Sequence, residues 1–262
     1  MTLRRGYADT PFGQLHYAEA GSGPVLLLLH QTPRSYDEFR EVQPLLADRH
    51  RVVAMDMLGF GLSAGLETPQ TIEQYAVGAF ALLDALEVGD AVVLGHHTGA
   101  AVALEMAAAH ATRVRALVLS SPPWTGPEYR SGRVSVDHVE TDADGNHLGE
   151  LWRLRQPYYP VGRPDLLERF VRDALAPGVD PAEGHRACHR YRMEDRVGLV
   201  TAPVLLIGAS ADPFALPNLA VLSERLTAAR SIDSAIIEGG TIPLMEHAPR
   251  EVAGLVGAFL RG

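Results

Sequence analysis

One histidine of this chain lies in a setting suited to chemistry. His97 stands at the centre of Gly95-His96-His97-Thr98-Gly99. The apolar run before it, residues 91–94, predicts a short strand, and the alanine-rich run after it, residues 100–110, predicts a helix. Glycines without a Cβ let such a helix pack closely against its strand. Since the ordinary pKa of imidazole is about 6.5, His97 can accept or deliver a proton at neutral pH.

This segment resembles the nucleophile elbow of the α/β-hydrolase family, where a sharp turn between strand and helix lifts a side chain into the pocket. The family usually carries serine there, and its haloalkane dehalogenases and epoxide hydrolases carry aspartate. Position 97 holds neither. The resemblance therefore implies the frame of a hydrolase in which an ordinary acyl-serine mechanism is not expected.

Two further segments fit the same family. His30-Gln31-Thr32-Pro33 is similar to its His-Gly-x-Pro turn, with Gln31 in place of glycine. The resemblance implies that the backbone N–H groups of Thr32 and Thr98 stabilise a developing oxyanion. Asp212 follows the strand that usually delivers the acid of the triad, one place later than in the commonest form. A His97–Asp212 pair is the arrangement that this predicts.

The family's general base normally lies in a Gly-x-His segment before the last helix. Here Thr241 occupies that place when counted from the glycines, and Ile242 when counted back from Pro249. Neither side chain accepts a proton at neutral pH. His247 is nearby, and its participation stays open.

Three functions follow from this pattern. The first is acid/base chemistry centred on His97, of lyase, isomerase, decarboxylase or cyclase type, on a small carbonyl compound. The alternative is hydrolysis of an ester, lactone or similar bond, with His97 activating water or acting as nucleophile. A second alternative is a non-catalytic ligand-binding protein with a hydrolase fold.

Short apolar runs alternate with helical patterns along the chain, which predicts an α/β fold with a mostly parallel central sheet flanked by helices. The expected strands are residues 6–9, 14–19, 25–29, 52–55, 91–94, 116–119, 204–207 and 235–238. The expected helices are residues 39–46, 72–86, 100–110, 148–156, 164–175, 181–192, 217–228 and 249–260. The predicted core comprises residues 1–120 and 200–262.

Residues 121–199 are rich in proline, arginine, histidine and aromatic residues, and we expect them to form a mainly helical cap over the pocket. The side chains expected to contact the substrate, besides the oxyanion turn, are Gln31, Arg34, Trp124, His185, His189, Tyr191 and Thr241. Arg34 is a candidate partner for a substrate carboxylate, with a surface salt bridge as the alternative. His185 and His189 have the i, i+4 spacing of metal ligands, but no acidic or thiolate set completes a site, so neither a metal nor a cofactor is predicted.

The composition of the chain limits the classes of molecule that it is expected to bind. The 262 residues carry a formal charge of −9, which argues against nucleic acid or an anionic membrane as partner and favours a small-molecule substrate. Cys188 is the only cysteine, so an intrachain disulfide is excluded. The first residues lack a long apolar run, and we expect a cytoplasmic protein, for which a homodimer is one possible state.

Overall fold

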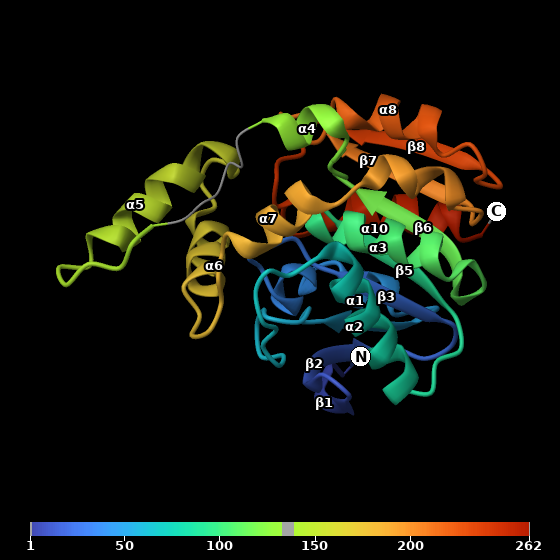
Figure 1. Cartoon of the computed structure of the whole chain (residues 1–262), viewed down its shortest axis with the longest axis horizontal. Helices are drawn as coiled ribbons and strands as arrows, with labels where there is room; N and C mark the ends of the chain where they lie inside the picture. The colour runs from blue at the N-terminus through green and yellow to red at the C-terminus, as the bar shows by residue number, and fades with distance from the viewer. Residues whose placement is uncertain (1, 133–138, 262) are drawn as a thin grey trace.

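The fold is built on one eight-stranded sheet, seen in a computed structural model that describes residues 2–132 and 139–261 (Figure 1). The strand order is β1-β2-β4-β3-β5-β6-β7-β8. The pairs β1·β2 and β2·β4 are antiparallel, and all other neighbours are parallel. The strands are β1 (Arg4–Thr10), β2 (Gly13–Ala20), β3 (Val25–Leu29), β4 (Arg51–Met55), β5 (Ala91–His96), β6 (Val114–Ser120), β7 (Val204–Ala209) and β8 (Ile232–Ile237).

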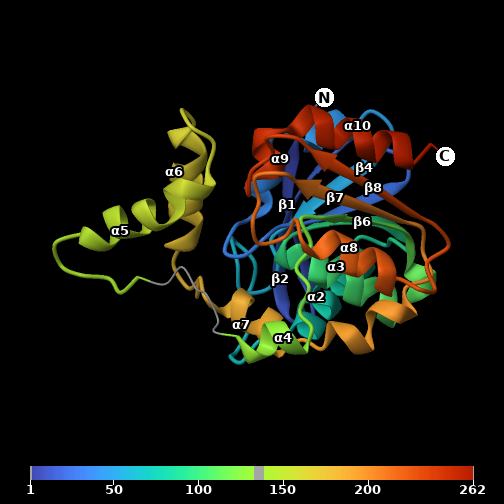
Figure 2. The same cartoon turned by 90° about the horizontal axis from the view of Figure 1, so that it is seen from above.

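The central strands are apolar on both faces because helices cover both. Leu27 and Leu29 pack into one hydrophobic cluster and Leu26 and Leu28 into another, as the alternation of side chains along a strand requires. The first cluster includes α2 (Ile72–Ala85), α3 (Thr98–Ala109) and α8 (Asn218–Arg225). The second includes α1 (Gln43–Leu46), α9 (Leu244–His247) and α10 (Pro249–Phe259), and Figure 2 shows α10 and α3 on opposite sides of the sheet.

Between β6 and β7 the chain forms α4 (Pro127–Ser131), α5 (Asn146–Arg155), α6 (Pro164–Ala174) and α7 (Glu183–Arg190). α7 packs on α2 and α3, whereas α5 and α6 project beyond the layers of the core (Figure 1). A small apolar cluster that includes Leu151, Leu166 and Phe170 joins α5 to α6. Residues 133–138, which fall in the predicted cap, lie outside the described part of the chain.

The predicted helix over residues 39–46 is wrong as a single element. The segment forms a 3-10 turn, Tyr36–Phe39, followed by the separate helix α1. Pro44 explains the break, because a proline lacks the N–H that a helix interior needs and is tolerated only in the first turn, where it lies in α1. Within residues 2–132 and 139–261, no helix is long and apolar enough to cross a membrane.

Candidate active site

The turn between β5 and α3 holds His97 in an unusual backbone conformation. Its φ is 47° and its ψ is −116°, a region that costs a non-glycine residue about 1 to 3 kcal/mol. The surrounding chain fixes it: the His97 N–H donates to the Ser120 carbonyl at 3.0 Å, and its own carbonyl accepts from Ala100 N at 2.8 Å. A Cβ on Gly99 would lie 2.1 Å from the Leu29 carbonyl oxygen, so the close approach of helix and strand requires glycine there.

His97 meets Asp212, as predicted. Nε2 of His97 lies 2.9 Å from Oδ2 of Asp212, although the contact lacks the alignment of a straight hydrogen bond. The carboxylate is fully buried, and its Oδ1 accepts hydrogen bonds from the backbone N–H groups of Phe214 and Ala215. Burial favours the neutral acid, but His97 and these donors more than offset it and lower the pKa of Asp212 to about 2. Asp212 is therefore an anion beside the imidazole.

The second ring nitrogen of His97, Nδ1, makes no hydrogen bond to the described residues. The His97 side chain is 16% exposed and lines a cavity of about 570 Å³. If Nε2, the ring nitrogen nearest Asp212, carries the proton of the neutral imidazole, Nδ1 is the basic nitrogen.

His96, the preceding residue, supports this arrangement from inside the core. A carbonyl oxygen only accepts hydrogen bonds, so His96 Nε2 donates to the Ile242 carbonyl at 2.9 Å, and its Nδ1 accepts from the Ser120 hydroxyl at 3.0 Å. Burial and the adjacent His97 lower the pKa of His96 to about 3, which keeps it neutral. His96 is therefore a hydrogen-bonded residue of the core and does not belong to the cavity lining.

The turn after β3 supplies a second wall of the site. The backbone N–H groups of Thr32 and Thr98 donate to no partner among the described residues, and both threonines line the cavity. Their hydroxyls lie 2.9 Å apart. His30 stabilises the turn through its contact with the Gln31 carbonyl at 2.8 Å and the hydrogen bond that it accepts from Met57 N at 2.9 Å.

Gln31, which replaces the glycine of the family pattern, is turned toward a buried acid. Its backbone N–H donates to Glu38 Oε2 at 2.8 Å, and its side-chain amide donates to Glu38 Oε1 at 2.5 Å. Burial raises the pKa of Glu38 to about 8. Glu38 therefore holds the turn that carries the Thr32 N–H.

The cavity lies between the strand ends and the helices that follow β6. Of the predicted contact residues, Gln31, Thr32, Thr98, Trp124 and His185 line it. The other lining residues are His97, Pro123, Tyr129, Leu154, Arg155, Tyr158, Cys188, Pro213, Phe214, Ala215, Asn218 and Ile242. Proline and aromatic content of residues 121–199 pointed to this region, but the directions of single side chains such as Arg155 and Tyr158 depend on packing between helices.

Arg34 has a different place from the one predicted. Its side chain is fully buried, its Nε donates to Asp173 at 2.9 Å, and its two terminal nitrogens donate to Glu246 at 2.7 and 3.0 Å. Arg169 of α6 joins the same network through Asp37 at 2.8 Å and Glu246 at 3.1 Å. These five residues, the cap-core ion network, tie α6 to the core. Arg34 thus forms neither the expected cavity contact nor a surface ion pair.

Three other predicted contacts also lie outside the cavity lining. The Tyr191 hydroxyl donates to Glu105 at 2.8 Å, because the chain turns at the end of α7 and directs this ring toward α3. The His189 ring contacts the Tyr129 ring in a tilted arrangement, with ring centroids 5.9 Å apart. Thr241 contacts His247 Nδ1 at 2.9 Å, and Ile242, not Thr241, occupies the place beside His96 and lines the cavity.

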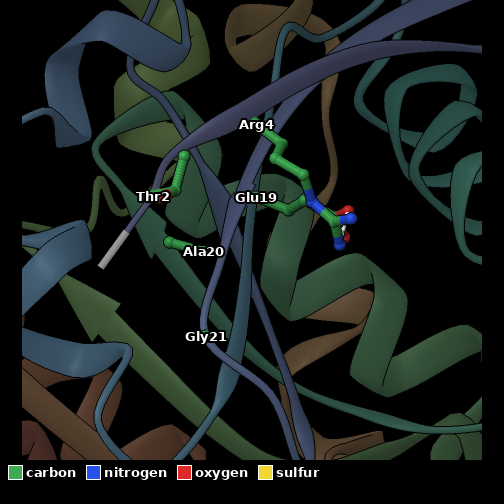
Figure 3. A pocket seen from close by; sticks show the side chains of 5 residues that line it. All are labelled: Thr2, Arg4, Glu19, Ala20 and Gly21. Carbon is green, nitrogen blue, oxygen red and sulfur yellow. Dashed lines mark ion pairs between the residues drawn. The ribbon is translucent and has the colours of Figure 1, made fainter.

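A second hollow, of about 380 Å³, lies elsewhere and is shown in Figure 3. It is lined by Thr2, Arg4, Glu19, Ala20 and Gly21, and Arg4 pairs with Glu19 at 3.0 Å. The register of β2 with β4 places it at the amino ends of the parallel strands, opposite the end that carries His97. Among the described residues, no group of three or more His, Cys, Asp and Glu side chains is arranged to hold a metal ion.

Comparison with known proteins identifies the family to which the chain is similar. A family model described as alpha/beta hydrolase fold matches residues 24–248. Bifunctional epoxide hydrolase 2 of Mus musculus is 36% identical over 133 residues, which are 48% of this chain and 24% of that protein. Haloalkane dehalogenase 2 of Mycobacterium bovis is 35% identical over 125 residues, which are 45% of this chain and 42% of that protein. The aligned part thus spans less than half the length of either relative.

Among solved structures, the enol-lactonase from Burkholderia xenovorans LB400 superposes with a TM-score of 0.79. The match covers 98% of this chain and 100% of that one, at 22% sequence identity. At that identity the likeness concerns the fold, and it extends over the core and the helices between β6 and β7.

Proposed function

This chain belongs to the α/β-hydrolase fold family, and from that premise we propose that it hydrolyses an ester, lactone or similar bond of a small molecule with water activated by His97. The observation that carries the proposal is the pairing of His97 Nε2 with Asp212 at 2.9 Å while the other ring nitrogen faces the cavity. A base held by a buried anion on one side and open to substrate on the other is the arrangement that general base catalysis needs.

The proposed reaction runs through one tetrahedral intermediate. His97 Nδ1 takes a proton from water as the water oxygen bonds to the carbonyl carbon, and the carbonyl π electrons move onto oxygen. The Thr32 and Thr98 N–H groups, which have no other acceptor among the described residues, stabilise that oxyanion. The intermediate then collapses, the bond to the leaving oxygen breaks, and the His97 imidazolium returns its proton to that oxygen. The Asp212 carboxylate stabilises the imidazolium in between.

The comparisons favour hydrolysis over the lyase, isomerase, decarboxylase or cyclase chemistry that the sequence first suggested. The two curated relatives are named an epoxide hydrolase and a haloalkane dehalogenase, neither of which is a lyase or an isomerase. Position 97 holds no carboxylate, so a covalent aspartyl ester is not available here, and water activation is the chemistry that the imidazole retains.

Direct attack by His97 is the other hydrolytic route. It forms a bond between Nδ1 and the acyl carbon and expels the leaving group, and water then cleaves the acyl-imidazole. The two routes differ in one observable: the acyl-imidazole route gives a burst of leaving group and an acylated His97 by mass spectrometry of quenched enzyme, whereas the water route gives neither.

The test is a panel of aryl esters, γ-lactones, enol lactones and epoxides, assayed with wild type and His97→Ala. We expect turnover of at least one carbonyl substrate and a loss of about 10²- to 10⁴-fold in kcat in the variant, the usual contribution of a general base. His247→Gln is the matched control, since His247 contacts Thr241 outside the cavity lining, and it should keep wild-type activity. Full activity of His97→Ala would refute the proposal.

A further inference from the structure

Two threonine hydroxyls meet at the wall of the cavity that His97 also lines. The Oγ1 atoms of Thr32 and Thr98 lie 2.9 Å apart, so one hydroxyl donates a hydrogen bond to the other. Both residues are buried, and neither hydroxyl has another oxygen or nitrogen partner among the described residues. Because each hydroxyl has one proton, the pair uses one proton between its two oxygens and keeps the other for a partner outside the pair.

Cys188 of α7 sets which of the two hydroxyls keeps that proton. Its side chain is buried and hydrogen-bonds to the side chain of Thr98. Burial raises the pKa of the thiol to about 12, so the sulfur retains its proton at neutral pH. If Thr98 donated to this sulfur, the S–H proton would have no acceptor among the described residues. The order Cys188 to Thr98 to Thr32 gives each proton inside the chain an oxygen acceptor, and the proton that remains is that of the Thr32 hydroxyl.

Helix α7 also holds the Thr32 side chain in place. This helix packs on α3, which begins at Thr98 (Figure 1). Gly184 and Cys188 are four positions apart in α7 and therefore lie on the same face, one turn apart. A Cβ on Gly184 would lie 2.2 Å from Thr32 Oγ1, so the helix backbone lies directly against this hydroxyl and the position requires glycine. One turn of α7 thus contacts both threonines and limits the movement of the hydroxyl pair.

The backbone N–H groups of the same two threonines are the oxyanion donors of the proposed reaction. From this juxtaposition we propose that the Thr32 hydroxyl is a third donor, which donates a hydrogen bond to the oxyanion formed at the substrate carbonyl. Thr98 and Cys188 act through that hydroxyl and are positioning residues. Hydrogen bonds in a chain polarise one another, so the two preceding donors strengthen the last one. The inference rests on the proposed function and goes beyond it by assigning a catalytic role to a side chain.

Substitution can remove the Thr32 hydroxyl and keep the Thr32 N–H. Thr32→Val retains the N–H, the branched Cβ and nearly the volume of threonine. We expect kcat on the best ester of the panel to fall by about 10- to 100-fold, the value of one hydrogen bond to a charged group, while KM changes less than about threefold. Thr32→Ser restores a hydroxyl and should stay within about threefold of wild type. An unchanged kcat in Thr32→Val would overturn the proposal.

Further variants test the order of the chain and guard against a folding defect. Thr98→Val removes only the donor to Thr32 Oγ1, so it should lower kcat less than Thr32→Val does, again without a change in KM. Thr241→Val makes the same substitution at a threonine outside the cavity lining, where the hydroxyl contacts His247, and should behave as wild type. A larger loss of kcat in Thr98→Val than in Thr32→Val would overturn the assignment to Thr32. If Thr32→Val does not fold, equal kcat in Thr32→Ser and Thr32→Ala would contradict a role for the hydroxyl.

Binding separates this inference from the proposed hydrolysis. The probes for calorimetric titration are the monomethyl ester of benzylphosphonic acid, a tetrahedral anion shaped like the intermediate, and N-methylphenylacetamide, a planar neutral amide. We expect Thr32→Val to weaken binding of the phosphonate by about tenfold or more and to leave binding of the amide unchanged. That result supports the third donor even if no ester is cleaved. Ester turnover together with equal phosphonate affinity in wild type and Thr32→Val supports hydrolysis alone and refutes the third donor, as does equal weakening of both probes.

Discussion

Two clusters of charged side chains lie near the carboxyl ends of the strands, and they differ in what their partners leave open. In the cap-core ion network, all three guanidinium nitrogens of Arg34 donate to Asp173 or Glu246, and the side chain is fully buried. In the His97–Asp212 pair, the acid is buried but the base keeps one ring nitrogen toward the cavity. A cluster whose polar groups all have hydrogen-bond partners stabilises the fold. A cluster with one unpaired ring nitrogen at the cavity can transfer a proton. The difference in accessibility, not in charge, separates the two roles.

The comparison predicts that breaking the ion network costs stability and leaves chemistry intact. Arg34→Met removes the cation and leaves Glu246 and Asp173 in a buried site, so we expect the free energy of unfolding to fall by about 3 to 5 kcal/mol. Urea denaturation measures it. For molecules that remain folded, kcat/KM on the best ester should stay within about threefold of wild type.

Arg115→Met is the control for that variant. Arg115 pairs with Asp90 at 2.9 Å, both side chains are exposed, and loss of an exposed ion pair changes stability by about 1 kcal/mol or less. Equal destabilisation by the two variants would remove the distinction between the buried network and a surface ion pair.

A substitution in the His97–Asp212 pair should instead lower the catalytic rate. Asp212→Asn keeps the shape of the side chain and can still accept from the Phe214 N–H, but it no longer stabilises an imidazolium. We expect kcat to fall by about 10- to 100-fold, the value of one charge-assisted contact. Steady-state kinetics on the best substrate checks this, and unchanged kcat would show that His97 works without its acid.

The lowered pKa of Asp212 predicts how the free energy of unfolding changes at acid pH. Its pKa is lowered from 3.8 to about 2, so the folded state favours the carboxylate and gains stability at pH values above about 4. That gain is lost as the pH falls from about 4 to 2. The difference in unfolding free energy between wild type and Asp212→Asn should shrink by about 2 kcal/mol over this window. Parallel curves for the two proteins between pH 5 and pH 2 would contradict the assignment.

Substitution of Tyr191 has the smallest expected effect on stability, and it tests whether this residue belongs to the binding site. Tyr191→Phe removes one hydrogen bond to Glu105, which Arg196 still pairs at 2.8 Å, so we expect a loss of about 1 kcal/mol in stability. Since Tyr191 is not part of the cavity lining, kcat/KM should not change on any substrate. A rise in KM without loss of stability would show that Tyr191 contacts the substrate.

Local signals predicted the sheet and the elbow well. The run of valine and leucine at residues 25–29 is β3 to the residue, and the glycines on both sides of His97, Gly95 and Gly99, mark a backbone contact too close for a Cβ. Such features depend on a few neighbours in sequence. The sequence also contains the cause of the helix break that the prediction missed. Pro44 would lie in the interior of a helix over residues 39–46, where a proline interrupts the helix.

The walls of the cavity were less predictable because they depend on how distant helices pack. Arg34 lies next to the oxyanion turn in sequence, yet α6 brings Asp173 to it and removes it from the cavity. Arg155 carries no motif, and its place in the cavity wall depends on how α5 packs against Phe170 of α6. The choice between Thr241 and Ile242 likewise required the carbonyl contact with His96.

The central claim is that an imidazole at the elbow replaces the usual nucleophile as a base. The most direct test is kcat/KM of His97→Gly with and without added imidazole. Glycine accepts the positive φ of this position, so the fold should persist. We predict that the variant is nearly inactive and that imidazole restores activity in a saturable manner. Wild-type activity of His97→Gly without imidazole would contradict the account.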